Sequence, residues 1–476
     1  MSLKRQAITG VKWSFVQQLS VQIINFGVQV ILARLLTPEM FGLIAMVIVF
    51  VSIGATLMDS GMTSSLIRTK TPEQKDYSTV FVTNLIVSCS VYGLVFIAAP
   101  YIAAFYKQAV LTDIVRVLAL SFVIRSFVAV HVAKLTKEMN FKLQMQLQIP
   151  SAIIGGGVGV SMAYTGYEVW SLVWLNLAQA LVFTVQNWLF IPWKPSLVFD
   201  KEKFKHHFRF GYKLTLASLI DTIFNDVYRI VIGKFYSPVQ VGYFHQAEML
   251  RLFPVQQLSA VLGKVTYPYF SNINSDASLK SAYKKTMKLV ISVTFPVMLV
   301  LILLAEELIR FLLGEKWLPA APYLQILATA SIIRPVSVYN LNILKVKGRS
   351  DLLLIIEVVK KALGVCFLAA GLAYGVMGIV VSLVLFSFSS YIINSSVSGS
   401  IINYPLWAQL KDMQVVVVVG LAVYLFIYSI KGALGSFNYP DFLLIIVFGM
   451  LTLMLCASLS VFFDKDLKRI VWSLRK

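Results

Sequence analysis

Long apolar runs separated by short polar segments extend along the chain from residue 11 to residue 463. A helix that crosses about 30 Å of hydrocarbon needs roughly 20 residues, and runs of that length recur throughout. No polar stretch is long enough for a soluble domain, and the ten-residue alternating segments typical of outer-membrane barrels are missing. The pattern predicts an all-α integral membrane protein with fourteen transmembrane helices, at residues 11–33, 41–58, 79–100, 112–134, 147–166, 169–191, 211–236, 242–264, 286–305, 320–344, 352–374, 376–400, 413–430 and 442–463.

The composition supports the membrane class. Of the 476 residues, 58% are hydrophobic and 13% are charged, and the mean hydropathy is +0.78. A soluble domain cannot carry that much apolar surface and stay in solution. The first apolar helix follows basic residues, but no small-residue cleavage site comes after it, so we expect it not to be a removed signal peptide. Cys89, Cys366 and Cys456 lie within predicted spans, where we expect buried thiols rather than disulfide partners or metal ligands.

Basic residues gather on one side of the predicted topology. With the N-terminus in the cytoplasm, 29 of the 42 Lys and Arg residues fall in cytoplasmic segments and seven fall outside. This is the positive-inside bias of an inner-membrane protein. The net charge of +20 therefore reflects topology, and we expect no nucleic-acid partner. We predict a multi-pass protein of the bacterial inner (cytoplasmic) membrane with both termini in the cytoplasm.

The sequence pattern of a turn at residues 33–42 recurs about 200 residues later, at residues 233–242. ARLLTPEMFG and GKFYSPVQVG share a small residue, a base, a hydroxyl, a proline and a final glycine in the same order. The two prolines stop one helix, and the two glycines open the next. Arg125 and Arg334 end similar segments, LSFVIR and TASIIR, at a comparable offset.

These correspondences predict an internal repeat. Six spans lie in each copy, so both copies enter the bilayer with the same orientation. We predict two parallel six-helix lobes around a central cavity, plus two accessory helices. The predicted domains are an N-terminal lobe at 1–200, a C-terminal lobe at 201–405, and the accessory pair with a cytoplasmic tail at 406–476.

The first helix of each predicted lobe carries polar side chains along one face, at steps of three or four residues. Facing lipid, these groups would lack hydrogen-bond partners at considerable cost, so they must face protein or water. We predict that both stripes line a shared aqueous cavity, the alternative being hydrogen bonding in a dry helix interface. The stripes are Ser14, Gln18, Gln22, Asn25 and Gln29, and Thr215, Ser218, Thr222, Asn225 and Arg229.

Four arginines, Arg125, Arg229, Arg251 and Arg334, lie in the middle of predicted spans. Each would cost about 2.5–3.5 kcal/mol at the bilayer centre, so four facing lipid would cost on the order of 10–14 kcal/mol, comparable to the stability of a domain. We therefore expect them to face inward. Guanidinium groups suit phosphate oxygens, and lobe interfaces are where repeat-built transporters bind substrate. The predicted ligand is an amphiphile with a phosphorylated head group.

Acidic residues within the membrane leave alternatives open. Asp226 and Glu248 each precede an arginine by three residues, so Arg229 and Arg251 can belong to structural ion pairs. Arg125 and Arg334 have no acid within four residues and are the better candidates for holding an anion. We expect no cofactor and no metal, other than a coupling proton or monovalent cation at one of four acids. The candidates are Asp59, Asp221, Asp226 and Glu248.

Four segments resemble bacterial polysaccharide-export proteins of the Wzx type, within the multidrug/oligosaccharidyl-lipid/polysaccharide exporter superfamily. They read MSLKRQAITGVKWS, LARLLTPEMFGLIAM, LMDSGMTSSLIR and LLGEKWLPAAPYLQIL. The colanic-acid branch is the most similar. The likeness runs over most of the chain, but its motifs label a family rather than a catalytic site.

The resemblance implies a flippase that moves undecaprenyl-diphosphate-linked oligosaccharide repeat units to the periplasmic leaflet by alternating access, for exopolysaccharide or O-antigen assembly. Cationic residues in its cavity would receive the sugar diphosphate, and by position this role passes to the four mid-span arginines. Besides membrane lipids, candidate partners are a polysaccharide polymerase and a chain-length regulator. No phosphate loop of the GxxxxGK[ST] type is present in the sequence.

Three other functions compete with the flippase. A cation-coupled multidrug antiporter of the same superfamily would need an acidic cavity, against which the four arginines count. An integral-membrane glycosyltransferase would need a catalytic carboxylate or a large loop outside the membrane, and the polar segments are short. A scaffold protein without transport activity would not explain the polar stripes within the membrane.

Overall fold

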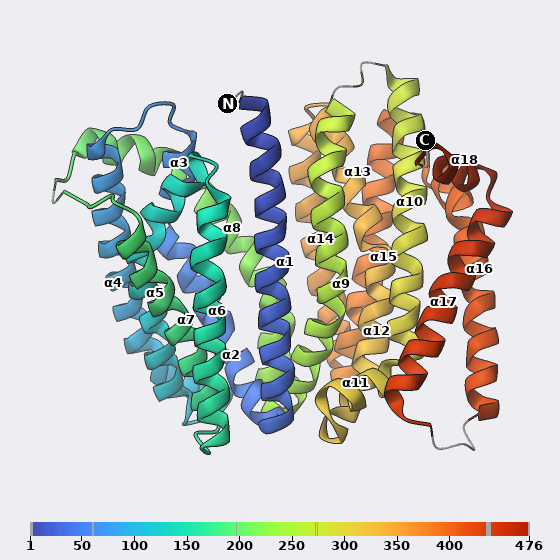
Figure 1. The fold of residues 1–476 in the computed structure, drawn as a ribbon, viewed down its shortest axis with the longest axis horizontal. Helices are drawn as coiled ribbons and strands as arrows, with labels where there is room; N and C mark the ends of the chain where they lie inside the picture. The colour runs from blue at the N-terminus through green and yellow to red at the C-terminus, as the bar shows by residue number, and fades with distance from the viewer. Residues whose placement is uncertain are drawn as a thin grey trace. The chain divides into compact units, whose positions relative to one another are not determined.

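The computed structural model describes residues 3–59, 61–196, 198–271, 273, 275–434 and 439–474. Within these ranges all regular secondary structure is helical (Figure 1). Arg475 and Lys476, which carry part of the predicted cytoplasmic charge, lie outside the described residues. The helices are α1 (Leu3–Leu35), α2 (Pro38–Asp59), α3 (Met62–Arg68), α4 (Gln74–Tyr106), α5 (Leu111–Lys137), α6 (Phe141–Tyr164), α7 (Trp170–Phe190), α8 (Lys201–Phe235), α9 (Pro238–Ser271), α10 (Asp276–Leu303), α11 (Ala305–Leu313), the 3-10 helix η1 (Glu315–Ala320), α12 (Ala321–Ile332), α13 (Arg334–Val346), α14 (Ser350–Leu372), α15 (Gly375–Ile401), α16 (Leu406–Leu434), α17 (Asp441–Phe463) and α18 (Lys465–Leu474).

Each predicted span falls on helix, in the predicted order. The span predicted at 320–344 is covered by two helices, α12 and α13, which are separated at Ile333. Pro335 stands in the first turn of α13, where its missing N–H breaks the ladder of the preceding helix. In the part of the chain that the structure describes, nine helices are long and apolar enough to cross a membrane. The count of fourteen spans stays a prediction.

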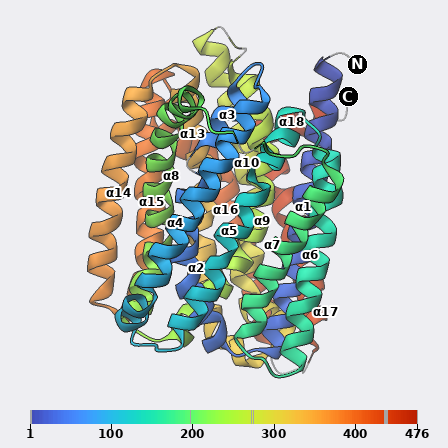
Figure 2. The ribbon, with the colours of Figure 1, turned by 90° about the vertical axis from the view of Figure 1, so that its left-hand side faces the viewer.

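The chain divides into two compact units, Met1–Gly242 and Tyr243–Lys476. In unit 1, α6 packs against both α1 and α7. Helix α5 packs against α4 and α7, and Figure 2 shows it between these two. Helix α8, which the repeat pattern assigns to the second lobe, packs on α2, α3 and α4. The lobe boundaries drawn from the sequence stay a prediction.

The two copies of the duplicated turn contact each other within unit 1. A Cβ atom added to Gly42 would lie 1.7 Å from the carbonyl oxygen of Pro238, and one added to Gly242 would lie 2.0 Å from that of Pro38. Pro38 and Pro238 are the first residues of α2 and α9, so the prediction that Gly42 and Gly242 open these helices is wrong: both glycines lie four residues inside them. The two turns therefore pack backbone against backbone in a reciprocal contact, which any side chain at either glycine would block.

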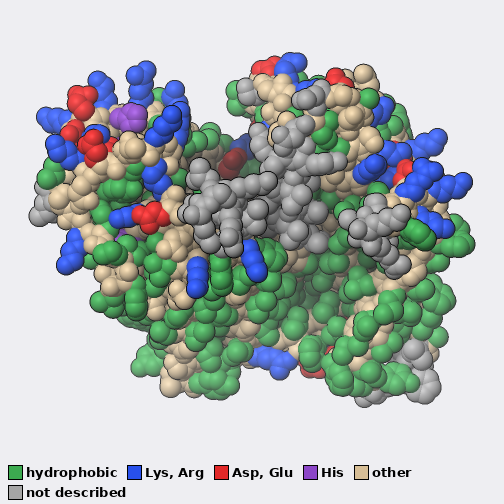
Figure 3. All heavy atoms as spheres, turned by 45° about the horizontal axis from the view of Figure 1, so that its top comes forward, with side chains coloured by type: hydrophobic (Ala, Val, Ile, Leu, Met, Phe, Trp, Pro, Cys, Tyr) green, Lys and Arg blue, Asp and Glu red, His purple; other side chains and the backbone are tan. Residues whose placement is uncertain are grey.

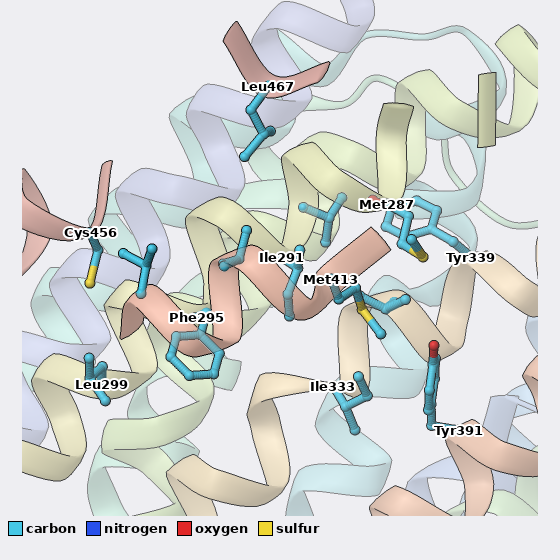
Figure 4. Packing of buried hydrophobic residues seen from close by; sticks show 14 of the residues in the cluster. Met287, Ile291, Phe295, Leu299, Ile333, Tyr339, Tyr391, Met413, Cys456 and Leu467 are labelled. Atoms are coloured by element: carbon cyan, nitrogen blue, oxygen red, sulfur yellow. The ribbon is translucent and has the colours of Figure 1, made fainter. Parts of the chain in front are cut away.

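In unit 2, α10 packs against α12, α13, α16 and α17. Figure 4 shows the apolar side chains that fill this packing, among them Phe295 from α10 and Met413 from α16. At one end of the core, Lys288 donates to Asp464 at 2.8 Å and to Asp466 at 3.0 Å. This buried charge cluster attaches α18 and the end of α17 to α10.

The three cysteines differ in exposure. Cys456 is buried, as predicted, but Cys89 and Cys366 are exposed, so the prediction of buried thiols is wrong for these two. Both lie in helices that are apolar nearly all round, α4 and α14, where the sequence does not distinguish the packed face from the outer face.

Candidate functional site

A cavity of about 370 Å³ lies inside unit 1, among α2, α3, α5, α6 and α7. Asp59 and Arg125, two of the residues singled out from the sequence, both line it. Two amides, Gln148 and Gln179, add hydrogen-bonding groups, while the rest of the wall is largely apolar. The apolar wall includes Met58, Ile67, Val128, Val132 and Phe183.

Asp59 is the last residue of α2, so its carboxylate lies at the negative end of the helix dipole. An acid there is destabilising by about 0.3–1 kcal/mol, unlike a base. The hydroxyl of Thr63 donates a hydrogen bond to it and partly offsets this cost. Gly61 then turns the chain with φ of +63°, where a Cβ atom would lie 2.4 Å from the oxygen of Gly211. The tight turn against α8 holds Asp59 at the cavity.

Arg125 lies in the middle of α5, and its side chain is exposed rather than packed away. Among the residues that the structure describes, no carboxylate lies within ion-pair distance of its guanidinium and no side chain hydrogen-bonds to it. Gln148 in the same cavity accepts a hydrogen bond from Gln17 of α1 at 2.6 Å. The cavity thus holds a cation without a carboxylate partner among the described residues, an acid, and an amide held by a hydrogen bond.

Asp59 also lines a second cavity of about 460 Å³, between α2 and α8. Thr215 and Ser218 of the predicted α8 stripe form its other wall. Further along the same two helices, the hydroxyl groups of Thr56 and Thr222 lie 3.2 Å apart. Asp59 is therefore shared by the cavity that holds Arg125 and the cavity lined by the α8 stripe.

Two of the other predicted arginines are paired with their own neighbours. Arg229 donates to Asp226 at 2.5 Å, and both side chains are largely buried. In unit 2, Arg251 donates to Glu248 at 3.3 Å and to the hydroxyl of Ser331 at 3.0 Å. These are the structural ion pairs that the three-residue spacing allowed. They leave Arg229 and Arg251 weaker candidates for an anion than Arg125.

Arg334 is the first residue of α13, at the break after α12, and its side chain is exposed. Within the described ranges, no acid lies within 4.0 Å of it. Its position at a helix start, beside Pro335, differs from the mid-helix position of Arg125. The predicted convergence of the four arginines on one chamber stays a prediction.

The predicted polar stripes are not covered within unit 1. The exposed members are Gln18, Asn25, Ser218 and Asn225, together with the neighbouring acid Asp221, and the half-buried members are Ser14, Gln22, Gln29, Thr215, Thr222 and Arg229. Since α1 packs on α6 through other positions, such as Val28 against Gly156, the stripe is left accessible.

Sequence reasoning missed a buried polar network outside the cavity. His207 lies 3.1 Å from Asp76 through Nε2 and 2.9 Å from the hydroxyl of Ser65 through Nδ1. Asp76 also accepts from Lys203 at 3.1 Å. All three members of this Ser-His-Asp arrangement are almost completely buried, and none of them lines a cavity described above. Its geometry suits attachment of α8 to α3 and α4 rather than catalysis. In the described part of the chain, no group of three or more His, Cys, Asp or Glu side chains is placed to hold a metal ion.

Comparison with known proteins gives matches along most of the chain. The profile of a family described as polysaccharide biosynthesis protein matches residues 31–322, more than half of the chain. The teichuronic acid biosynthesis protein TuaB of Bacillus subtilis (strain 168) is 24% identical over 74% of this chain and 73% of its own length. The lipopolysaccharide biosynthesis protein WzxC of Escherichia coli (strain K12) is 25% identical over 74% of this chain and 72% of its own.

A solved structure shares the fold. The lipid II flippase MurJ, in an inward closed conformation, superposes with a TM-score of 0.76 over 93% of this chain and 97% of its own length. Its sequence identity of 16% limits the likeness to the fold. The arrangement of helices in this chain is thus that of the MurJ fold.

Proposed function

The chain belongs to the family of polysaccharide biosynthesis proteins, and from this premise we propose that it is a flippase for lipid-linked oligosaccharides. Its substrate would be an undecaprenyl-diphosphate-linked repeat unit, moved from the cytoplasmic to the periplasmic leaflet by alternating access. The protein would lie in the inner membrane with both termini in the cytoplasm. The product would enter exopolysaccharide or O-antigen assembly.

The observation that carries the proposal is the uncompensated Arg125 in a cavity with apolar walls. A guanidinium beside apolar walls attracts an anion more strongly than one in open water, and its planar donors match phosphate oxygens. An apolar wall beside it suits the hydrocarbon part of an amphiphile. Arg334, which is also without an acid within 4.0 Å among the described residues, is the second candidate ligand.

Asp59 has the properties expected of a coupling residue. It is half-buried, it lies at the unfavourable end of a helix, and it is shared by two cavities. Binding of a proton or monovalent cation would remove its negative charge. A charge change at this point alters the field that Arg125 experiences, because both side chains line the same cavity. We propose that this change assists the return of the empty transporter.

Deletion of the gene in the native host tests the proposal. Sugar-loaded undecaprenyl diphosphate should accumulate with its head group facing the cytoplasm, as measured by lipid extraction and leaflet-specific labelling. Complementation with Arg125→Ala or Arg334→Ala should reproduce that accumulation at normal protein levels. Loss of a charged hydrogen bond costs about 1.5–3 kcal/mol, so we expect roughly tenfold to hundredfold slower transport.

Arg116→Ala is the matched control. It removes an arginine from the same helix, but one near the start of α5 whose guanidinium lies 4.3 Å from the ring centroid of Phe96. Transport by this variant should be close to that of the wild type. Normal surface polysaccharide in the deletion strain, without accumulated lipid-linked sugar, would contradict the proposed function.

A further inference from the structure

The N-terminal part of α8 carries a ladder of aromatic residues next to a ladder of bases. Phe204, Phe208 and Tyr212 stack in sequence, with ring centroids 5.3 Å and 5.8 Å apart. A base directly follows each of them, so the cations also recur at every fourth position. The bases are Lys205, Arg209 and Lys213.

These bases line a surface hollow of about 660 Å³. Phe210 lies in its wall, and Arg68 from α3 is placed over the same ring at 4.8 Å. His206 and Leu214 complete the lining, and Glu202 is its only acid. Figure 3 shows Lys and Arg side chains gathered beside a histidine at the end of unit 1 that carries α3 and the start of α8.

The cations of the hollow are not neutralised by the protein. Among the described residues, no carboxylate lies within 4.0 Å of Lys205, Arg209, Lys213 or Arg68. The neighbouring Lys203, on another face of α8, pairs with Asp76 at 3.1 Å and Glu73 at 3.5 Å. Like charges four residues apart destabilise a helix. The concentration of bases on one face therefore has a cost that a bound anion would remove.

The hollow lies where α8 enters the membrane. The predicted span begins at residue 211, so the segment from Lys205 to Lys213 crosses the predicted boundary. Eight residues of helix rise about 12 Å, which is enough to extend through the head-group layer on that side. Tyr212 has the amphipathic character of residues at membrane interfaces. Clusters of bases next to a transmembrane helix typically bind lipid phosphates.

We propose that this hollow is a docking site for the diphosphate head group of the lipid-linked substrate in the cytoplasmic leaflet. The inference rests on the proposed function. Three bases and one acid line the hollow, and Arg68 adds a further positive charge from the side. This surplus matches a diphosphate better than the single charge of an ordinary phospholipid. Docking here concentrates the substrate at the start of α8, whose next turns include Thr215 and Ser218 of the cavity shared with Asp59.

Equilibrium binding of radiolabelled undecaprenyl diphosphate to the purified full-length protein in detergent tests the inference. The variant Lys205→Gln/Arg209→Gln/Lys213→Gln removes the three α8 bases that line the hollow. At about fivefold per charge, its dissociation constant at low salt should rise on the order of 100-fold. The matched control is Lys70→Gln/Lys75→Gln/Lys194→Gln, which removes three exposed lysines from other segments of the predicted cytoplasmic side of unit 1. It should bind as the wild type does.

Competition binding with unlabelled compounds distinguishes the lipid-linked diphosphate from other phosphate-containing ligands. Unlabelled undecaprenyl diphosphate should displace the label at far lower concentration than phosphatidylglycerol or inorganic diphosphate. Equal displacement by phosphatidylglycerol, or equal affinity of the two triple variants, would overturn the inference. Should the α8 triple variant fold poorly, Arg209→Gln alone should still weaken binding about fivefold. Accumulation caused by Arg125→Ala, together with unchanged binding by the α8 variant, would refute docking while leaving the flippase standing.

Discussion

At the scale of single residues, His207 is a buried titratable group that joins three helices of unit 1. It contacts Asp76 of α4 and Ser65 of α3 from its own position in α8. Burial lowers the pKa of His207 below its ordinary value of 6.5, against an opposing effect of the Asp76 carboxylate, while His206 and Lys203 lower it further. The folded protein therefore favours the neutral imidazole.

We predict that acidification weakens unit 1 through this histidine. A group whose pKa is lower in the folded state stabilises above its unfolded pKa, and that contribution is lost as pH falls below 6.5. The melting temperature of the purified protein should fall more between pH 7.5 and pH 5.5 for the wild type than for His207→Gln, whose amide does not titrate there. An equal fall in both proteins would show that His207 does not contribute.

Residue spacing predicted the ion pairs of Arg229 and Arg251 because both partners of each pair lie on one helix, three positions apart. The same reasoning could not find Gln148 or Gln179 as cavity residues. They come from α6 and α7, and only packing brings them beside Arg125 of α5. His207 was missed for a similar reason, since its partners are separated from it by more than 130 residues.

At the scale of elements, the two proline-glycine turns have a role that capping alone does not explain. Each glycine lies against the carbonyl group of the other copy's proline. Because the two turns contact each other reciprocally, the close backbone approach that requires glycine at position 42 also requires glycine at position 242.

We predict that Gly42→Ala destabilises the protein. Its new methyl group would lie 1.7 Å from the Pro238 oxygen, so the helices must move apart. Overpacking of this kind costs about 1–3 kcal/mol, which lowers the melting temperature by roughly 2–10 °C. Gly93→Ala in α4 is the control, because nothing lies within 4 Å of a Cβ there. It should be neutral or stabilising by about 0.5–1 kcal/mol. Similar melting temperatures for the two variants would contradict the packing explanation.

The positions of the long helices were predictable because apolar runs of membrane length are a local property of the chain. Breaks and faces were less predictable. The division between α12 and α13 falls inside one apolar run, and the exposure of Cys89 and Cys366 depends on which neighbours each helix finds.

At the scale of the whole molecule, the resemblance to Wzx-type exporters drawn from four segments is confirmed by the family match, and the predicted all-α membrane class is confirmed by the fold shared with MurJ. The multi-pass membrane character agrees with the nine helices of membrane-spanning length in the part of the chain that the structure describes. The undecaprenyl-linked substrate and the colanic-acid branch stay predictions.

We predict that the membrane potential drives the loaded half of the cycle. A diphosphate carries about two negative charges. At a typical membrane potential, its movement out of the negative interior lowers the free energy by on the order of 5–7 kcal/mol. In proteoliposomes, transport should accelerate with a potential negative on the cytoplasmic side and slow when an ionophore collapses it. Proton or cation gradients should change the rate for the wild type but not for Asp59→Asn. Indifference of the wild type to both potential and gradients would refute the driving force and the coupling role.

Local hydropathy and similarity along the chain were enough to predict the membrane class, the order of the helices and the family, while the internal repeat stays a prediction. Tertiary structure decided which polar groups share a space: Asp59 with Arg125 in one cavity, Asp59 with the α8 stripe in another, and three α8 bases with Arg68 around one ring. The length of an apolar run predicts how far a helix extends. Only packing between helices selects the neighbours of a charged side chain.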